Sequence, residues 1–175
     1  ILVITGCVKI PEGIEPVKNF RLERYLGTWY EIARLDHSFE KGLQQVTARY
    51  TRRPDGGIRV INRGYSEAES EWQDAEGVAY FAQGSSVGFL KVSFFGPFYS
   101  SYIIFELDHQ DYQYAFVCGP NRSYLWLLSR SPRIDEKLRK RFINSAGALG
   151  FDISELIFFD QEGNSRRENS RGQKT

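Results

Sequence analysis

The chain has 175 residues, a length that suits one domain with a substantial hydrophobic core. Its 23 basic and 22 acidic side chains leave a formal net charge of +1, so bulk charge implies neither nucleic acid nor an anionic membrane as a partner. No basic run alternates with aromatic residues, so no nucleic-acid partner is expected. The aromatic share of 15% suits strands and the walls of an apolar cavity.

The first residues resemble the end of a bacterial export signal. Ile4-Thr5-Gly6-Cys7 is similar to a lipobox, in which the cysteine is acylated and becomes the first residue of the mature protein. Residues 1–6 are therefore expected to be a signal remnant and residues 7–18 a lipidated tether, with Cys7 as the anchor. Val8 after the cysteine resembles the pattern that sorts lipoproteins to the outer membrane. The alternatives are a short buried strand with a buried thiol, or a disulfide to the other cysteine.

A short helical turn over residues 19–26 precedes a series of strand-like segments with close spacing. Their connections are mostly short and rich in Gly, Ser, Asp and Asn, which predicts hairpins. The eight segments are 28–35, 46–52, 58–65, 72–81, 88–95, 102–107, 114–119 and 124–130. Closure into an eight-stranded up-and-down antiparallel β-barrel removes both exposed edges and leaves room for one small ligand. We therefore expect an all-β fold; a two-sheet sandwich is the alternative.

One helix and a ninth strand are predicted after the barrel. The helix is expected to run from Pro132 to about Ala148, with Ser131 as its N-cap. Its apolar positions recur every fourth residue and predict one packed face, formed by Ile134, Leu138, Phe142 and Ala146. Residues 156–159 are expected to pair beside the barrel. No aliphatic or aromatic residue occurs from 161 to 175, which predicts a disordered polar tail.

Two separated motifs predict that the first and last long strands meet. Gly27 permits a sharp turn before Trp29 opens the first strand, and Arg130 ends the eighth. An arginine guanidinium is the side chain that stacks best on an indole face. The pair therefore indicates a closed structure.

These motifs resemble those of the lipocalin family, and so does the predicted order of nine strands with one helix before the last. The resemblance covers residues 19–160. The segments 25–34, 91–99 and 117–120 are similar to its bacterial outer-membrane group. The resemblance implies a carrier of fatty acids or lysophospholipids, anchored in the bacterial outer membrane and facing the periplasm. It also implies that Gly27, Trp29 and Arg130 form the closed end of the barrel and do not contact the ligand.

The sequence offers little sign of catalysis, and we expect neither an enzyme nor a cofactor. His37 and His109 have no spacing typical of a metal site. Cys118 lies in an apolar strand with no adjacent base and is expected to be an inert buried thiol. Two alternatives remain: a structural envelope lipoprotein with a packed barrel, and a lipid-modifying enzyme that uses Cys118.

Alternation along the strands predicts which side chains face the barrel interior. The inward set is mostly apolar and aromatic, as in a lipid pocket, and consists of Ala48, Tyr50, Val60, Asn62, Val92, Phe94, Trp126 and Leu128. The resemblance supports Tyr50, Asn62, Phe94 and Trp126, and we expect the ligand between these four, at the end opposite Trp29.

The sequence does not decide two features near the mouth of the barrel, which is the end opposite Trp29. The candidate cations for a lipid head group are Arg34, Arg63 and Lys91. The aromatic loop 94–99 could dip into a membrane, form a homodimer contact, or pack on its own barrel.

Overall fold

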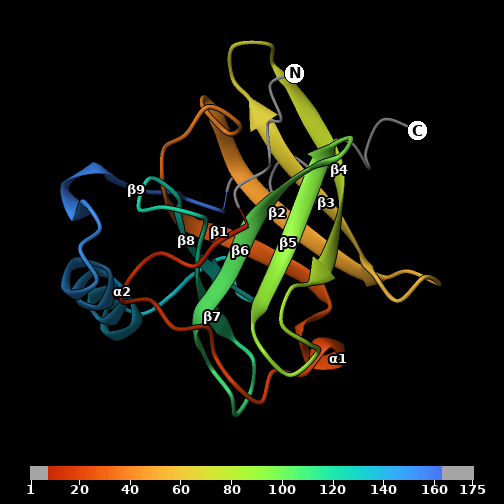
Figure 1. Ribbon diagram of the computed structural model, residues 1–175. Coiled ribbons are helices and arrows are strands. Elements are labelled where there is room, and N and C mark those ends of the chain that lie inside the picture. The colour runs from red at the N-terminus through yellow and green to blue at the C-terminus, as the bar shows by residue number, and fades with distance from the viewer. Residues whose placement is uncertain (1–7, 163–175) are drawn as a thin grey trace, which may run out of the picture.

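The structure is a computed structural model that describes residues 8–162 (Figure 1). Cys7 with the signal remnant before it, and residues 163–175 of the predicted tail, lie outside the described residues. The strands are β1 (Gly27–Leu35), β2 (Leu43–Arg52), β3 (Ile58–Ser66), β4 (Glu71–Phe81), β5 (Phe89–Phe95), β6 (Phe98–Leu107), β7 (Tyr114–Cys118), β8 (Leu125–Ser129) and β9 (Leu156–Phe158). The helices are α1 (Leu22–Tyr25), α2 (Glu136–Ala148) and the 3-10 helix η1 (Ile153–Glu155). Within 8–162 none of them has the length and hydropathy to span a bilayer.

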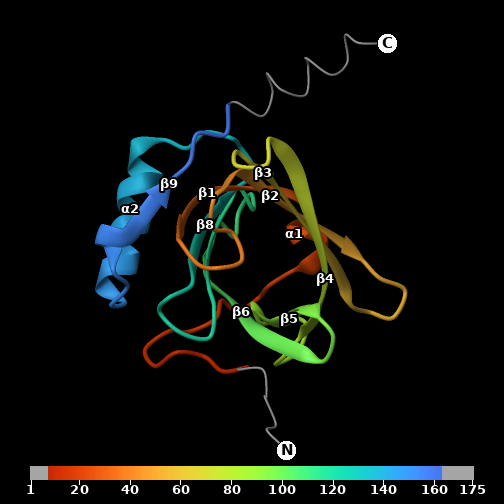
Figure 2. The ribbon, with the colours of Figure 1, turned by 90° about the horizontal axis from the view of Figure 1, so that it is seen from above.

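The first eight strands close into the predicted antiparallel barrel. Each strand pairs with its neighbour in the chain, and β1 pairs with both β2 and β8. Gly27 lies opposite Tyr50 of β2, and Tyr30 lies opposite Ser129 of β8. The view from above in Figure 2 shows the ring of strands with α2 outside it. The fold is therefore an eight-stranded up-and-down barrel with one C-terminal helix and a short ninth strand, and not a sandwich.

Strand β1 changes partner halfway along its length. Its first half pairs with β2, whereas Ala33 to Leu35 pair with β9, and a β-bulge lies between Glu31 and Ala33. Where the strands part, the Gln161 side-chain amide donates to the Glu31 carbonyl (2.6 Å) and to the Val46 carbonyl (3.2 Å). Gln161 is only 1% exposed, so the first residue of the predicted disordered tail is in fact part of the fold.

Helix α2 begins later than predicted, and its N-cap is Asp135, not Ser131. The Asp135 carboxylate accepts a hydrogen bond from the Leu138 N–H at 2.7 Å. Ser131 instead accepts from the Arg133 N–H in the turn before the helix (3.3 Å). Both residue types are good caps, and the folded turn decides between them. The predicted apolar face packs on the outside of the barrel, where the Phe142 ring lies 5.0 Å from that of Phe116.

The predicted tether differs from its expected form, because residues 8–18 lie against the barrel. Val17 donates its N–H to the Ile104 carbonyl (2.9 Å) and accepts from the Gly88 N–H (2.8 Å), so it bridges β6 and the start of β5. The Arg122 guanidinium donates to the Glu12 carbonyl at 2.6 Å. The segment therefore covers part of the outer wall with Ile10 and Ile14, and Val17 packs against the interior core.

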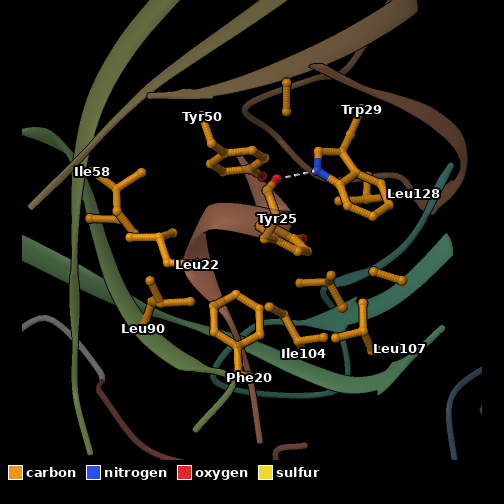
Figure 3. Packing of buried hydrophobic residues seen from close by; sticks show 14 of the residues in the cluster. Phe20, Leu22, Tyr25, Trp29, Tyr50, Ile58, Leu90, Ile104, Leu107 and Leu128 are labelled. Carbon is orange, nitrogen blue, oxygen red and sulfur yellow. Dashed lines mark hydrogen bonds between the residues drawn. The ribbon is translucent and has the colours of Figure 1, made fainter. Parts of the chain in front are cut away.

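The closed end is held by Arg130 and Trp29. The Arg130 guanidinium carbon lies 3.9 Å from the centre of the Trp29 ring, and its nitrogens donate to the carbonyls of Arg24, Thr28 and Leu26 at 2.8–2.9 Å. The Trp29 Nε1–H donates to the Tyr25 carbonyl (2.8 Å), as the dashed line in Figure 3 shows. Gly27 has φ +99°, and a Cβ there would lie 3.3 Å from Arg130. The glycine thus permits both the turn and the close approach of the guanidinium.

We expect Trp29→Ala to lower the free energy of unfolding by about 3–5 kcal/mol, because it leaves a cavity beneath the half-buried Arg130 guanidinium. Urea unfolding at neutral pH measures this change. Trp72→Ala is the matched control: this half-buried Trp lies on the outer wall, and its loss is expected to cost about 1 kcal/mol or less. Equal losses in the two variants would contradict the role of Trp29 in the closed end.

Candidate functional site

The eight side chains predicted to line the barrel all lie on its inner face. Ala48, Tyr50, Val60 and Leu128 are buried members of the interior core, and Val92, Phe94 and Trp126 pack partly buried against it. Asn62 lies opposite Ala48 in the β2–β3 register and therefore shares its face. Alternation along the strands thus places the whole set inside the barrel.

These side chains lie at different heights in the barrel and do not form one cluster. Tyr50 is opposite Gly27 at the closed end, and its ring lies 5.4 Å from that of Tyr25. Trp126 is opposite Arg34, toward the mouth. Tyr50 therefore belongs to the floor of the interior, whereas we expected it at the opposite end.

Three tyrosine hydroxyls meet at the floor of the interior, and two of these tyrosines, Tyr25 and Tyr102, are not among the lining residues predicted from the sequence. The Tyr102 hydroxyl lies 2.7 Å from that of Tyr25 and 2.8 Å from that of Tyr50. Burial raises the pKa of all three phenols, so they stay neutral. Strand alternation could have revealed Tyr102, which is two residues before the inward-facing Ile104.

The lower half of the interior is filled by side chains. Figure 3 shows Tyr50 and Tyr25 above Phe20, with Leu22 and Ile58 beside them. The space that these residues enclose with Ala79, Leu90, Tyr102 and, on its mouth side, Val92 is about 10 Å³, room for about one water molecule. An acyl chain cannot occupy this level without moving side chains.

The upper half is more accessible. Asn62, Val92, Phe94 and Trp126 face inward but are only half-buried, unlike Tyr50 and Val60 below them. Part of the surface of each of these four inward-facing residues therefore stays accessible. They offer an apolar and aromatic wall with one amide, a composition that suits a lipid tail.

A buried ionic cluster anchors the loop 36–42 at the mouth. The Arg34 guanidinium is 2% exposed and donates to Glu31 Oε1 (2.9 Å), Asp36 Oδ1 (3.2 Å) and the Glu40 carbonyl (2.8 Å). Arg34 is therefore already paired and is not free for a lipid head group.

The carboxylate of Glu40 links this cluster to the ligand wall. Glu40 Oε2 accepts from Trp126 Nε1 (3.1 Å) and lies 2.9 Å from His37 Nε2. The Trp126 ring is in edge contact with that of His37, with centroids 5.3 Å apart. Any movement of loop 36–42 is thus coupled to the position of Trp126.

The two buried carboxyl groups differ in their affinity for protons. Burial, and then the nearby negative charge of Glu40, raise the pKa of Glu31 well above its usual range. Burial also acts on Glu40, but the hydrogen bonds from His37 and Trp126 outweigh it and lower the pKa of that carboxyl. Glu40 is therefore the carboxyl that carries the negative charge.

The other candidate cations lie on the outer face of the barrel. The Arg63 guanidinium stacks over Trp72 at 5.1 Å, and Lys91 Nζ lies 5.1 Å from the Tyr99 ring centre. Neither side chain points into the interior. Arg63 and Lys91 are adjacent in sequence to the inward-facing Asn62 and Val92, and adjacent residues of a strand point to opposite faces.

Cys118 is fully buried in the outer core between barrel and helix. Burial raises the pKa of its thiol to about 12, so the thiolate that a nucleophile requires is scarce. This environment disfavours the enzyme alternative that uses Cys118. Residues 8–162 also contain no cluster of three or more side chains that could hold a metal ion.

Comparison with known proteins adds a family relationship. The profile of the lipocalin-like domain family matches residues 20–161. The chain is 57% identical over 161 residues to the outer membrane lipoprotein Blc of Vibrio cholerae, covering 92% of this chain and 94% of that protein. It is 51% identical over 153 residues to outer membrane lipoprotein Blc of Escherichia coli K12, with 87% and 86% coverage. The cockroach allergen Per a 4 shares the fold, with a TM-score of 0.69 at 18% identity over 92% of this chain and 98% of that one.

Glu31→Gln is expected to change the pH dependence of stability. The folded-state pKa of Glu31 is raised, so the stability contributed by its neutral form is present at low pH and is lost as the pH rises through that pKa. Glutamine is neutral at every pH, so the variant should gain stability relative to the parent as the pH rises. Urea unfolding from about pH 5 to pH 8 measures this trend.

Glu40→Gln is the control of opposite sign. Its lowered pKa means that the carboxylate contributes stability above the unfolded pKa and loses it as the pH falls. We expect this variant to lose about 3 kcal/mol at neutral pH and less in acid. Parallel stability curves for the two variants would contradict the assigned protonation states.

The thiol of Cys118 should react with a soluble disulfide reagent at least about a hundredfold more slowly in the folded protein than in urea, because both burial and its raised pKa suppress attack. Absorbance of the released thiolate measures the rate. Rapid reaction of the folded protein at this residue would restore the enzyme alternative.

Proposed function

The chain belongs to the lipocalin family, and we propose that it is a lipoprotein that carries a fatty acid or lysophospholipid in the mouth half of its barrel. The observation that carries this proposal is the half-buried inner wall formed by Asn62, Val92, Phe94 and Trp126. These side chains face inward, stay partly accessible and are mostly apolar. Of the eight inward-facing residues predicted from the sequence, these four are the proposed contacts of the acyl chain, whereas Ala48, Tyr50, Val60 and Leu128 are buried core residues that limit how deep the chain reaches.

The dimensions of the interior favour a ligand with a single acyl chain. An eight-stranded barrel holds one small ligand, and here the tyrosine hydroxyls of the floor already satisfy one another. A charged head group loses hydration when it is buried, so it should stay at the mouth while the tail points toward Tyr50. Fatty acids and lysophospholipids both fit this arrangement.

Acylation at Cys7 would anchor the carrier in the outer membrane, facing the periplasm. The lipobox-like sequence before Cys7 supports this location, and so do the names of the relatives from Vibrio cholerae and Escherichia coli. A carrier in this place would serve the maintenance of the membrane by storing or transporting lipids. This role needs neither a cofactor nor a metal.

A structural envelope lipoprotein is the second candidate function. The observation that favours it is the filled lower interior, where only about 10 Å³ is open. A barrel packed in this way along its whole length would bind no lipid. Lipid binding therefore separates the two functions.

Delipidated protein is expected to bind a fluorescent fatty acid with one-to-one stoichiometry, and lysophospholipid should displace it. Asn62→Trp should weaken binding at least about tenfold, because the indole fills the mouth half of the interior. Fluorescence titration measures both effects.

Ile61→Trp is the matched control, since the adjacent residue points to the outer face and lines the outer wall instead. Its affinity for the fatty acid should equal that of the parent. If delipidated parent protein shows no saturable binding, the carrier function is wrong and the structural one is favoured.

A further inference from the structure

Three phenylalanines are exposed at the mouth end of the barrel, and two of them lie in one hairpin. Phe95 is 72% exposed and Phe98 is 48% exposed, and the two are opposite each other in the hairpin between β5 and β6. Phe39, on the loop between β1 and β2 at the same end, is 68% exposed. Exposed aromatic side chains in such positions usually mark a contact with a partner or a membrane.

The described chain starts beside this hairpin. Ser101 Oγ accepts a hydrogen bond from the Lys9 N–H (2.7 Å) and donates one to the Lys9 carbonyl (2.6 Å), which fixes Lys9 on the outer face of β6. Ser101 is three residues from Phe98 and six from Leu107 at the other end of the strand. With about 3.3 Å per residue, Lys9 lies about 10 Å from the hairpin. Figure 2 shows the red start of the chain beside β6.

The anchor cannot lie far from this point. Cys7 is two residues before Lys9, and an extended chain spans at most about 3.6 Å per residue, so the acylated residue lies within about 7 Å of Lys9. This step rests on the proposed acylation of Cys7. A bilayer that holds the acyl chains must therefore approach the mouth half of β6 and not the closed end.

The charged side chains around the mouth indicate which side of the barrel faces the bilayer. Lys9 is exposed beside the hairpin, and Lys91 lies opposite Ser101 on the same outer face. Both ammonium groups are placed to meet lipid phosphates. The turn between β3 and β4, at the same end, carries three exposed carboxylates, Glu67, Glu69 and Glu71. These carboxylates favour water, so the hairpin is the side that faces the bilayer.

We propose that the β5–β6 hairpin inserts Phe95 and Phe98 into the phospholipid bilayer surface that holds the anchor, so that the hairpin side of the barrel mouth lies against the membrane. The apolar side chains then enter the interfacial region while Lys9 and Lys91 stay at the level of the head groups.

Site-specific fluorescence quenching in vesicles tests this orientation. The acylated protein is labelled with a polarity-sensitive dye at Pro97→Cys in the hairpin, or at Gln110→Cys in the closed-end loop between β6 and β7. The buried thiol of Cys118 is expected to stay unlabelled. The vesicles contain phosphatidylethanolamine and phosphatidylcholine, with a quencher on part of the acyl chains. We expect several-fold stronger quenching at position 97 than at position 110.

The hairpin aromatics are tested in the same assay. Phe95→Ser combined with Phe98→Ser should abolish most of the quenching at position 97. Ile153→Ser combined with Ile157→Ser is the matched control, because these exposed isoleucines lie in η1 and β9, and it should leave the quenching unchanged. Loss of quenching in the control alone, or in neither variant, would overturn the role of the hairpin.

The remaining outcomes distinguish this inference from the proposed function. Equal quenching at the two positions, or stronger quenching at 110, overturns the orientation. If the emission of the dye at position 97 shifts with protein concentration in the absence of vesicles, the hairpin is a homodimer contact, which also overturns the orientation. If the protein does not float with the vesicles, the anchor and this orientation fail together. Fluorescent fatty acid binding, measured on the same samples, reports separately whether the barrel carries lipid.

Discussion

The stacking of Arg130 on Trp29 is the interaction on which the barrel depends. One guanidinium covers the indole face and satisfies carbonyls of Arg24, Leu26 and Thr28, where the chain leaves α1 and enters β1. The three hydrogen bonds tie the guanidinium to the backbone on both sides of Gly27, so this contact fixes the entry angle of β1. Because β1 pairs with β2, β8 and β9, its position determines the register of the strands that close the ring.

The two ends of the barrel are stabilised by different chemistry. At the closed end, Tyr25, Tyr50 and Tyr102 form a neutral hydroxyl cluster within an apolar core. At the mouth, Arg34 and Glu40 form a charged cluster that holds the loop 36–42 and contacts the ligand wall through Trp126. A neutral, filled floor resists change, whereas the buried ionic cluster at the mouth can rearrange as protonation changes. This difference is why we assign lipid exchange to the mouth.

The sequence predicted most of the strands and the inward face of each one. It failed where a choice depends on contacts between distant segments. Asp135 and Ser131 are both good N-caps, and only the packed turn selects Asp135. Gln161 looks like part of a polar tail, yet the gap between β1 and β2 gives its amide two carbonyl partners. Residues 8–18 look like a linker, although Val17 bridges two strands.

The sequence by itself determined the family through its motifs, and the barrel topology through the short connections between eight strands. It also determined which side chains face inward, because alternation along a strand is a local property with a period of two residues. The tertiary structure decided the height of each side chain in the barrel. Tyr50 lies on the floor and Trp126 at the mouth because strand register sets these levels. The hydroxyls of Tyr25 and Tyr102 meet across 77 residues of chain, and the ring must close before such a contact exists.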